Sequence, residues 1–325
     1  MTMGAGGLAE FADETLESNP ARWSSKRASI DALLWLASTT SARILNIFDM
    51  ACNLINARGE MLALVAPEIG LGPHNLILPS INNSGDSLIP FSRWMKLSSA
   101  VHVTDEELSV EALVVAFRDA QPWDSRVPWK AIRSRRNELL GKISCIAAFA
   151  KHYPMEGSLL DFVPQLVHGE AIKASENAQM HARLLAAAWK PASLLCLGIR
   201  NDDIALCREG AAGLAGMGVG STPSGDDFVI GALYAMRILH SARRSSELAS
   251  AMLAEMVSRT NRLSRIWLEA AAEGKAVEAW HDLLGELGNS SNLSIECSVG
   301  RILKVGHTSG ADALAGFIAV LAAKA

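Results

Sequence analysis

Two segments in the last third of the chain repeat one short pattern, and this repeat constrains the fold more than any other feature. Both contain Ser-Gly-x-Asp, then three apolar or small residues, then glycine, at 224–231 and at 309–316. The residues at 228–236 and 313–323 carry no charge. A helix that is apolar all round belongs in a protein core. We therefore expect two buried helices that start at these motifs, with their N-termini close together.

The loop before the first motif is rich in groups that bind ligands. Gly216, Gly218 and Gly220 alternate there, and glycine lets a ligand approach the backbone closely. Free N–H groups at a helix start bind anions, whereas carboxylates such as those of Asp226 and Asp227 suit a hard cation such as Mg²⁺. A simpler hypothesis is that each motif is a capping box, in which the serine caps its own helix. Such a cap stabilises by about 1 kcal/mol and needs no ligand.

The adjacent carboxylates need partners, because they would repel a bare phosphate and so offset the attraction of the helix start. Arg262 and Arg265 are the best candidates for balancing this charge. Thr260, Ser264 and Leu268 fall on one face of a helix at four-residue spacing, so this helix is expected to turn hydroxyls inward. An arginine face in solvent is the alternative interpretation.

The predicted site combines both helix starts with this later helix. His307 is the histidine that we select, because it lies inside the second loop; an imidazole bonded to backbone is the alternative. We predict catalytic roles for Asp226, Asp227 and His307, and the same two aspartates are the predicted ligands of Mg²⁺. The predicted substrate-binding residues are Gly218, Gly220, Thr222, Ser224, Gly225, Thr308, Ser309, Gly310, Asp312, Arg262, Ser264 and Arg265.

Composition excludes several classes of function. The chain has 325 residues and a formal net charge of −4, and its densest basic cluster, at 133–136, is too small to hold a nucleic-acid backbone. Acidic residues stand where a signal peptide has its apolar core, and no window has the roughly 18 uninterrupted apolar residues of a membrane span. Five scattered cysteines form no CxxC motif, which supports neither zinc nor disulfides. We expect a cytoplasmic protein that binds neither nucleic acid nor membrane, and an oligomer is compatible with the sequence.

The texture of the chain predicts an α+β protein with a smaller β-containing N-terminal part and a larger, mainly α-helical C-terminal part. We place a loosely held segment at 1–29 and the β-containing part at 30–122. The helical part, which carries the motifs, is placed at 123–325.

Individual elements follow from local patterns. Short apolar runs at 44–48 and 61–65 flank a turn signal at 56–59 and are expected as strands. Ser84-Gly85-Asp86 echoes the repeated motif and is expected as a loop turn, and a helix is expected from about 105. From Pro128 onward helical periods dominate, over 129–152, 165–189, 204–215, 224–240, 245–272, 295–304 and 309–323.

The run Gly218-Val219-Gly220-Ser221-Thr222-Pro223-Ser224-Gly225-Asp226-Asp227-Phe228 resembles the signature of the AllH-like family, Gly-x-Gly-Leu-Thr-Pro-Ser-Gly-Asp-Asp-Phe. Ser221 departs from this pattern, which could mark a paralogue that acts on another ureide or carbamoyl compound. The helix with Thr260, Ser264 and Leu268 and the segment 306–316 also resemble the C-terminal half of that family. The resemblance covers about 190–320 and is only general in the N-terminal part.

Members of the AllH-like family are small subunits associated with oxamate carbamoyltransferase in anaerobic allantoin breakdown. The resemblance therefore implies carbamoyl transfer between oxalurate, phosphate, oxamate and carbamoyl phosphate. It also implies FdrA-like (AllF-type) and AllG-type subunits as partners.

Three hypotheses follow, in this order. The first is a carbamoyltransferase subunit whose paired helix starts bind a small anionic or carbamoylated substrate, or a metal-bridged phosphate. The second is a stand-alone metal-dependent hydrolase, since Gly-x-Thr-Ser-Gly-x-Asp before a small-residue helix is faintly similar to the metal-binding helix starts of ADP-ribosylglycohydrolases. The third is a non-catalytic scaffold subunit whose motifs only cap buried helices.

Overall fold

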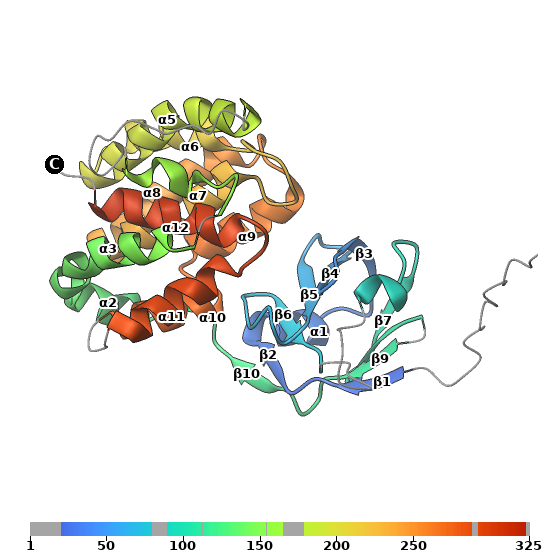
Figure 1. Ribbon diagram of the computed structural model, residues 1–325. Coiled ribbons are helices and arrows are strands. Elements are labelled where there is room, and N and C mark those ends of the chain that lie inside the picture. Colours follow the sequence, from blue (N-terminus) through green and yellow to red (C-terminus); the bar gives the residue numbers. More distant parts are fainter. Residues whose placement is uncertain are drawn as a thin grey trace, which may run out of the picture.

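The chain folds into two parts of different architecture, a β-rich N-terminal part and a helical C-terminal part (Figure 1). The computed structural model describes residues 21–79, 90–111, 113–153, 155–164, 179–287 and 292–322. Each part has its own hydrophobic core. The predicted α+β class is confirmed.

The N-terminal part is a curved half-barrel sheet with one helix packed on it. In the described residues the strand order is β1-β9-β8-β7-β3-β4-β5-β6-β2-β10. Helix α1 (Ile30–Ala37) buries Trp35 and Leu36 in the core of the sheet. The strands are β1 (Ala21–Ser24), β2 (Arg27–Ser29), β3 (Ser41–Ile47), β4 (Ala51–Asn56), β5 (Met61–Val65), β6 (Asn75–Ile77), β7 (Ala100–Val103), β8 (Glu107–Val110), β9 (Leu113–Ala116) and β10 (Gln121–Trp123).

The turn predicted at 56–59 is confirmed, and it lies between β4 and β5. Gly59 has a φ of +83°, which glycine adopts without strain. The Asn56 side chain accepts hydrogen bonds from the backbone N–H groups of Arg58 and Glu60, both at 3.0 Å. This Asx turn joins the antiparallel strands β4 and β5. The apolar runs expected as strands, 44–48 and 61–65, lie in β3 and β5, so β4, the strand before the turn, was not predicted.

Two expectations for the N-terminal part are wrong. The loosely held segment was expected to reach residue 29, but Ala21–Ser24 and Arg27–Ser29 are strands of the sheet. The helix expected from 105 is instead β8, followed by β9, because burial alternates with the two-residue period of a strand. Residues 1–20 and the turn expected at 84–86 lie outside the described residues.

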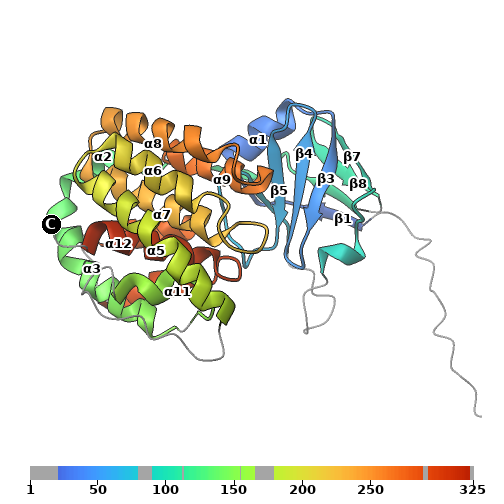
Figure 2. The ribbon, with the colours of Figure 1, turned by 90° about the horizontal axis from the view of Figure 1, so that it is seen from above.

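The C-terminal part is a helical assembly whose central pair is α7 and α12 (Figures 1 and 2). Its helices are α2 (Trp129–Ser134), α3 (Arg136–Lys151), α5 (Gln179–Arg200), α6 (Ile204–Leu214), α7 (Ser224–Leu239), α8 (Ala242–Met256), α9 (Arg262–Ala272), α10 (Glu278–Glu286), α11 (Asn292–Leu303) and α12 (Ser309–Ala322), with the short 3₁₀ turn η2 (Leu159–Phe162). The other 3₁₀ turn, η1 (Phe91–Arg93), belongs to the N-terminal part, where Phe91 is buried in the core. The helix expected at 245–272 is in fact two, because Asn261 caps a new helix with its side chain. Residues 165–178 of another expected helix lie outside the described residues.

The prediction of two buried helices that start at the repeated motifs is confirmed. Helix α7 is buried along almost its whole length, and α12 is buried from Gly310 to Val320. The two backbones touch: a Cβ on Gly231 would overlap the carbonyl group of Ala313, and a Cβ on Gly316 would overlap that of Phe228. Glycine at both positions therefore allows the close crossing of the central pair.

One helix of the described residues, Met180–Arg200, is long and apolar enough to cross a membrane by length and composition alone. It contains Pro191 and packs on α6, where a Cβ on Gly210 would overlap the backbone of Leu195. In this structure the segment is therefore one layer of the helical assembly.

Candidate functional site

The repeat in the sequence is a repeat in space. At each helix start the motif glycine packs against the end of the preceding helix: a Cβ on Gly225 would overlap the carbonyl oxygen of Leu214, and a Cβ on Gly310 that of Ile302. The loops before the two helices are also alike. Gly218 and Gly306 both have positive φ, and both lie against the motif serine of their own loop. Helices α6 and α7 therefore match α11 and α12 as two copies of one unit.

The motif serines contact the opposite copy, which differs from the expected capping box. Helix α7 begins at Ser224, and no side chain caps it. The hydroxyls of Thr222 and Ser309 donate instead to Asp227, and those of Ser224 and Thr308 donate to Asp312. Thr222 Oγ1 also lies 2.8 Å from Ser309 Oγ. The two helix starts are thus joined by exchanged Ser–Asp contacts.

Asp227 and Asp312 form a buried carboxyl pair. Burial, together with the nearby charge of Asp312, raises the pKa of Asp227 well above its ordinary value. Burial also raises the pKa of Asp312 to about 6, although Leu159 N–H donates to its Oδ1 at 2.6 Å. The Oδ2 atom of each aspartate is buried and has no hydrogen-bond partner. These directions favour a protonated Asp227 at neutral pH.

Asp226, the extra carboxylate of the first motif, ties the motif to α9. Its Oδ1 accepts the backbone N–H of Gly216 at 2.9 Å, and its Oδ2 accepts the hydroxyl of Ser264 at 2.7 Å and that of Thr260. The residue is fully buried. Of the hydroxyl face predicted for this helix, Ser264 lies on α9 and points inward, whereas Thr260 lies in the turn before the N-cap residue Asn261. Both carboxylate oxygens of Asp226 accept hydrogen bonds from protein donors.

The start of α9 brings three segments together. Asn261 caps α9 by accepting the N–H of Ser264, and its side-chain amide donates to the carbonyl of Ser221 at 2.9 Å. Together with the Thr222–Ser309 contact, this joins the first loop, the second loop and α9. His307 is exposed in the second loop.

The two predicted arginines do not reach the motif aspartates. Arg265 pairs with Glu269 at 2.7 Å. Arg262 is exposed, lies beside Gly59 of the β-containing part, and forms no hydrogen bond or ion pair within the described ranges. Both side chains instead line a cleft between the two parts of the protein.

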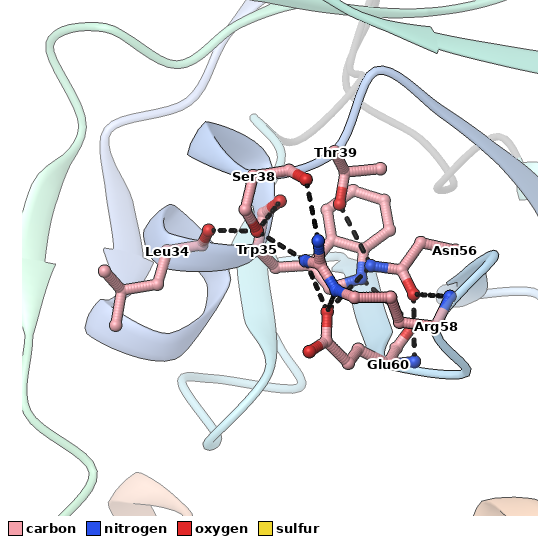
Figure 3. Close-up of polar contacts among 7 residues, drawn as sticks. All are labelled: Leu34, Trp35, Ser38, Thr39, Asn56, Arg58 and Glu60. Carbon is pink, nitrogen blue, oxygen red and sulfur yellow. Dashed lines mark hydrogen bonds and ion pairs between the residues drawn. The ribbon is translucent and has the colours of Figure 1, made fainter.

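This cleft has a volume of about 760 Å³. One wall is a single face of α9, since its lining positions from Arg262 to Glu273 recur at helical spacing. The opposite wall is α1 and the β4–β5 turn, where the Arg58 guanidinium is held by Glu60 and by Ser38 (Figure 3). Lys275 closes one end through ion pairs with Asp31 at 2.9 Å and Glu273 at 2.8 Å.

His74 also lines the cleft, although no motif in its sequence neighbourhood marks it as a site residue. Its ring packs edge-on against Trp267, with centroids 5.7 Å apart, and its Nε2 is buried without a hydrogen-bond partner. Burial lowers the pKa of His74 to about 4, so the ring is neutral at physiological pH. Only folding brings this strand-edge histidine beside a helix almost 200 positions later in the chain.

No group of three or more His, Cys, Asp or Glu side chains that could hold a metal occurs in the described part of the chain. The predicted Mg²⁺ site at Asp226 and Asp227 stays a prediction. Of these two carboxylates, only Asp227 has an oxygen without a hydrogen-bond partner.

Fold and site together define a two-part protein with a polar cleft between a half-barrel sheet and a helical part built on a repeated unit. Comparison with protein families gives the description "Oxamate carbamoyltransferase subunit AllH" for residues 214–321 and "AllH family N-terminal domain" for residues 26–122. The chain therefore belongs to the AllH family, whose name denotes a subunit of a transferase, oxamate carbamoyltransferase. Comparisons with curated proteins and with solved structures give no match.

Proposed function

We propose that this carbamoyltransferase subunit binds the small anionic, carbamoylated substrate where the two motif loops meet the cleft. The observation that carries the proposal is that Arg262 forms no ion pair within the described residues. Three other cations line the cleft, and Arg58, Arg265 and Lys275 each pair with a carboxylate of the protein. Arg262 has no such partner within the described residues, and a guanidinium presents a planar fork that binds carboxylate or phosphate in bidentate fashion.

The motif residues have different roles in this proposal. Asp226 holds Thr260 and Ser264, and so fixes the start of the helix that carries Arg262. The exposed parts of the first loop at Gly218 and Gly220, with Thr308 and His307 of the second loop, lie beside that helix start and supply further donors. Asp227 and Asp312 hold the two loops together, because each accepts hydroxyl hydrogen bonds from both loops.

The wider setting of the proposal comes from the family. We propose a soluble cytoplasmic subunit that works with FdrA-like and AllG-type subunits in the interconversion of oxalurate or oxamate and carbamoyl phosphate. In this assembly the chain contributes substrate binding.

The test is calorimetry on the isolated chain with carbamoyl phosphate, phosphate and oxamate, with and without Mg²⁺. We expect Arg262→Gln to weaken binding by at least about tenfold, which is roughly 1.4 kcal/mol. Arg265→Gln is the matched control on the same helix face, because its charge is already paired with Glu269, and less than a twofold change is expected.

Each alternative hypothesis has its own outcome. Ligand binding that is unchanged in Arg262→Gln overturns the assignment of the site. Hydrolysis by the isolated chain that depends on two divalent ions per chain favours the stand-alone hydrolase. No binding of any ligand, with full activity of a complex that contains Arg262→Gln, favours the scaffold.

A further inference from the structure

A second cavity, of about 550 Å³, lies beside the cleft and is formed by other elements. One wall is a face of α8 with Ser246, Ala249, Ser250 and Leu253, which recur at helical spacing. Ala242, the first residue of α8, also lines this cavity. The remaining lining residues come from the linker before α2, from α7, and from the end of α9 and the turn that follows it: Arg126, Arg237, Glu269, Ala272 and Glu273.

Arg237 is the unusual residue of this cavity, because its guanidinium is buried without an ion-pair partner in the described residues. The residue is 8% exposed. Its Nη2 donates to the carbonyl of Ala272, whereas its Nε is buried and has no partner. Burying an uncompensated charge is unfavourable by several kcal/mol, and such groups are normally paired.

The guanidinium is also held in place. Gly274 has a φ of +84°, and a Cβ there would lie 2.9 Å from Arg237 Cζ and 2.7 Å from Trp129 Nε1. The absence of a side chain at Gly274 therefore makes the space that Arg237 occupies. The contact to Ala272 caps the C-terminus of α9, but a cap needs only one edge of the guanidinium and leaves Nε unexplained.

Charges of both signs lie near Arg237, and the carboxylate of Glu273 is among them. Arg133 Nη1 donates to the Arg237 carbonyl at 3.2 Å. Burial and the charge of Arg133 both lower the pKa of the Arg237 guanidinium. Arg126 and Arg133 have no ion pair in the parts of the chain that the structure describes. The two carboxylates of the lining are engaged elsewhere, since Glu269 pairs with Arg265 and Glu273 with Lys275.

We propose that this cavity is a second anion site, which takes the phosphoryl group of a small phosphorylated molecule or phosphate itself. Arg237 and Arg126 supply the charge and the planar donors that a phosphoryl group needs. The hydroxyls of Ser246 and Ser250 lie one helical turn apart on the same wall, and Ala249, Leu253 and Ala272 offer apolar surface to an organic part. The proposal is independent of the cleft, because it shares only two paired glutamates with it.

The experiment measures phosphate and glycerol phosphate binding by calorimetry in the full chain with Arg262→Gln, which weakens the proposed cleft site. We expect one remaining phosphate site per chain. Arg126→Gln, at an exposed position, should weaken it by about tenfold, and so should Arg237→Lys, which keeps a charge but loses the fork. Arg243→Gln is the control, because Arg243 is exposed on α8 and already pairs with Glu247; less than a twofold change is expected there.

Each outcome decides the proposal. If only the cleft site fails, the unsubstituted chain binds one phosphate, and Arg262→Gln does not change that binding. Absence of phosphate binding in the Arg262→Gln chain overturns the second site, as does binding that Arg126→Gln and Arg237→Lys leave unchanged. Acetate that binds as tightly as phosphate overturns the phosphoryl assignment. If Arg237→Lys fails to fold, Arg126→Gln alone carries the test.

Discussion

The two copies of the repeated unit are alike inside and different at their edge. In both, a glycine packs against the preceding helix and a serine contacts the aspartate of the other copy. The first copy has Asp226 where the second has Ala311, and its loop is longer. Asp226 reaches out of the repeat to α9, whereas nothing at Ala311 can do so.

The shared features of the two copies and the feature found in one copy alone have different roles. Features shared by both copies keep two apolar helices in contact and bury their polar starts. The feature present in one copy alone fixes the helix that forms a wall of the cleft and carries Arg262. The repeated motif therefore lies in the core of the helical part. Asp226, the residue that only the first copy has, connects this core to the cleft.

The largest effects are expected from the shared glycines. Gly231→Ala and Gly316→Ala each push a Cβ into the backbone of the partner helix, so each should lower the free energy of unfolding by more than about 3 kcal/mol, as overpacking does at the upper end. Urea unfolding followed by circular dichroism measures the change. The control is Gly285→Ala in α10, where a Cβ has open space. A loss below about 1 kcal/mol in either variant would show that the copies are not locked by this crossing.

A smaller effect is expected where the copies differ. Asp226→Ala removes the acceptor of three hydrogen bonds and leaves the N–H of Gly216 without a partner. We expect about 2–3 kcal/mol of destabilisation and weaker anion binding at the cleft, because a buried charged acceptor is lost. Ser264→Ala, which removes one donor, should lose about 1 kcal/mol. Unchanged anion binding in a folded Asp226→Ala chain contradicts the link between the first copy and the cleft.

The sequence was sufficient to predict the central pair of helices, because their signal is local. An uncharged run behind a Ser-Gly-x-Asp motif predicts burial whatever the neighbours are. Helical spacing predicted that Thr260 and Ser264 turn their hydroxyls inward, and both donate to Asp226, although Thr260 lies in the turn before α9 and not on the helix. The N-terminal sheet was predicted only in part, since the acidic start at 105–107 resembles a helix start while the strand alternation follows it.

The cleft was beyond prediction from the sequence, because it depends on how two parts of the chain dock. Arg58 and His74 carry no local signal, and their neighbours on α9 are far away in sequence. The exchange of serine contacts between the copies was missed for a related reason. A capping box and an exchanged pair have the same spacing in sequence, and only the crossing of the helices decides between them.

The buried carboxyl pair makes the free energy of unfolding depend on pH. Because the pKa of Asp312 rises to about 6 on folding, the native state binds more protons than the unfolded chain between about pH 4 and 6. The contribution of Asp312 to the free energy of unfolding is therefore complete at low pH and falls by about 3 kcal/mol as the pH rises through this window. Asp312→Asn should remove this loss, so the stability of the variant relative to the natural chain increases from pH 4 to pH 7. Urea midpoints across this range measure it, with the exposed Asp119→Asn as control, and a difference that does not vary with pH contradicts the assignment.

The smallest effect is expected at the tips of the two loops, where the copies place different exposed side chains. Val219 is 82% exposed in the first loop, and His307 is exposed in the second. Neither His307→Ala nor Val219→Ala should change the free energy of unfolding by more than about 0.5 kcal/mol, because surface substitutions of this kind rarely do. Calorimetry with carbamoyl phosphate should separate them, with about a threefold loss of affinity for His307→Ala alone, since only an imidazole can donate to the anion. Equal losses in both variants would assign the effect to loop geometry, and no loss in either would remove His307 from the site.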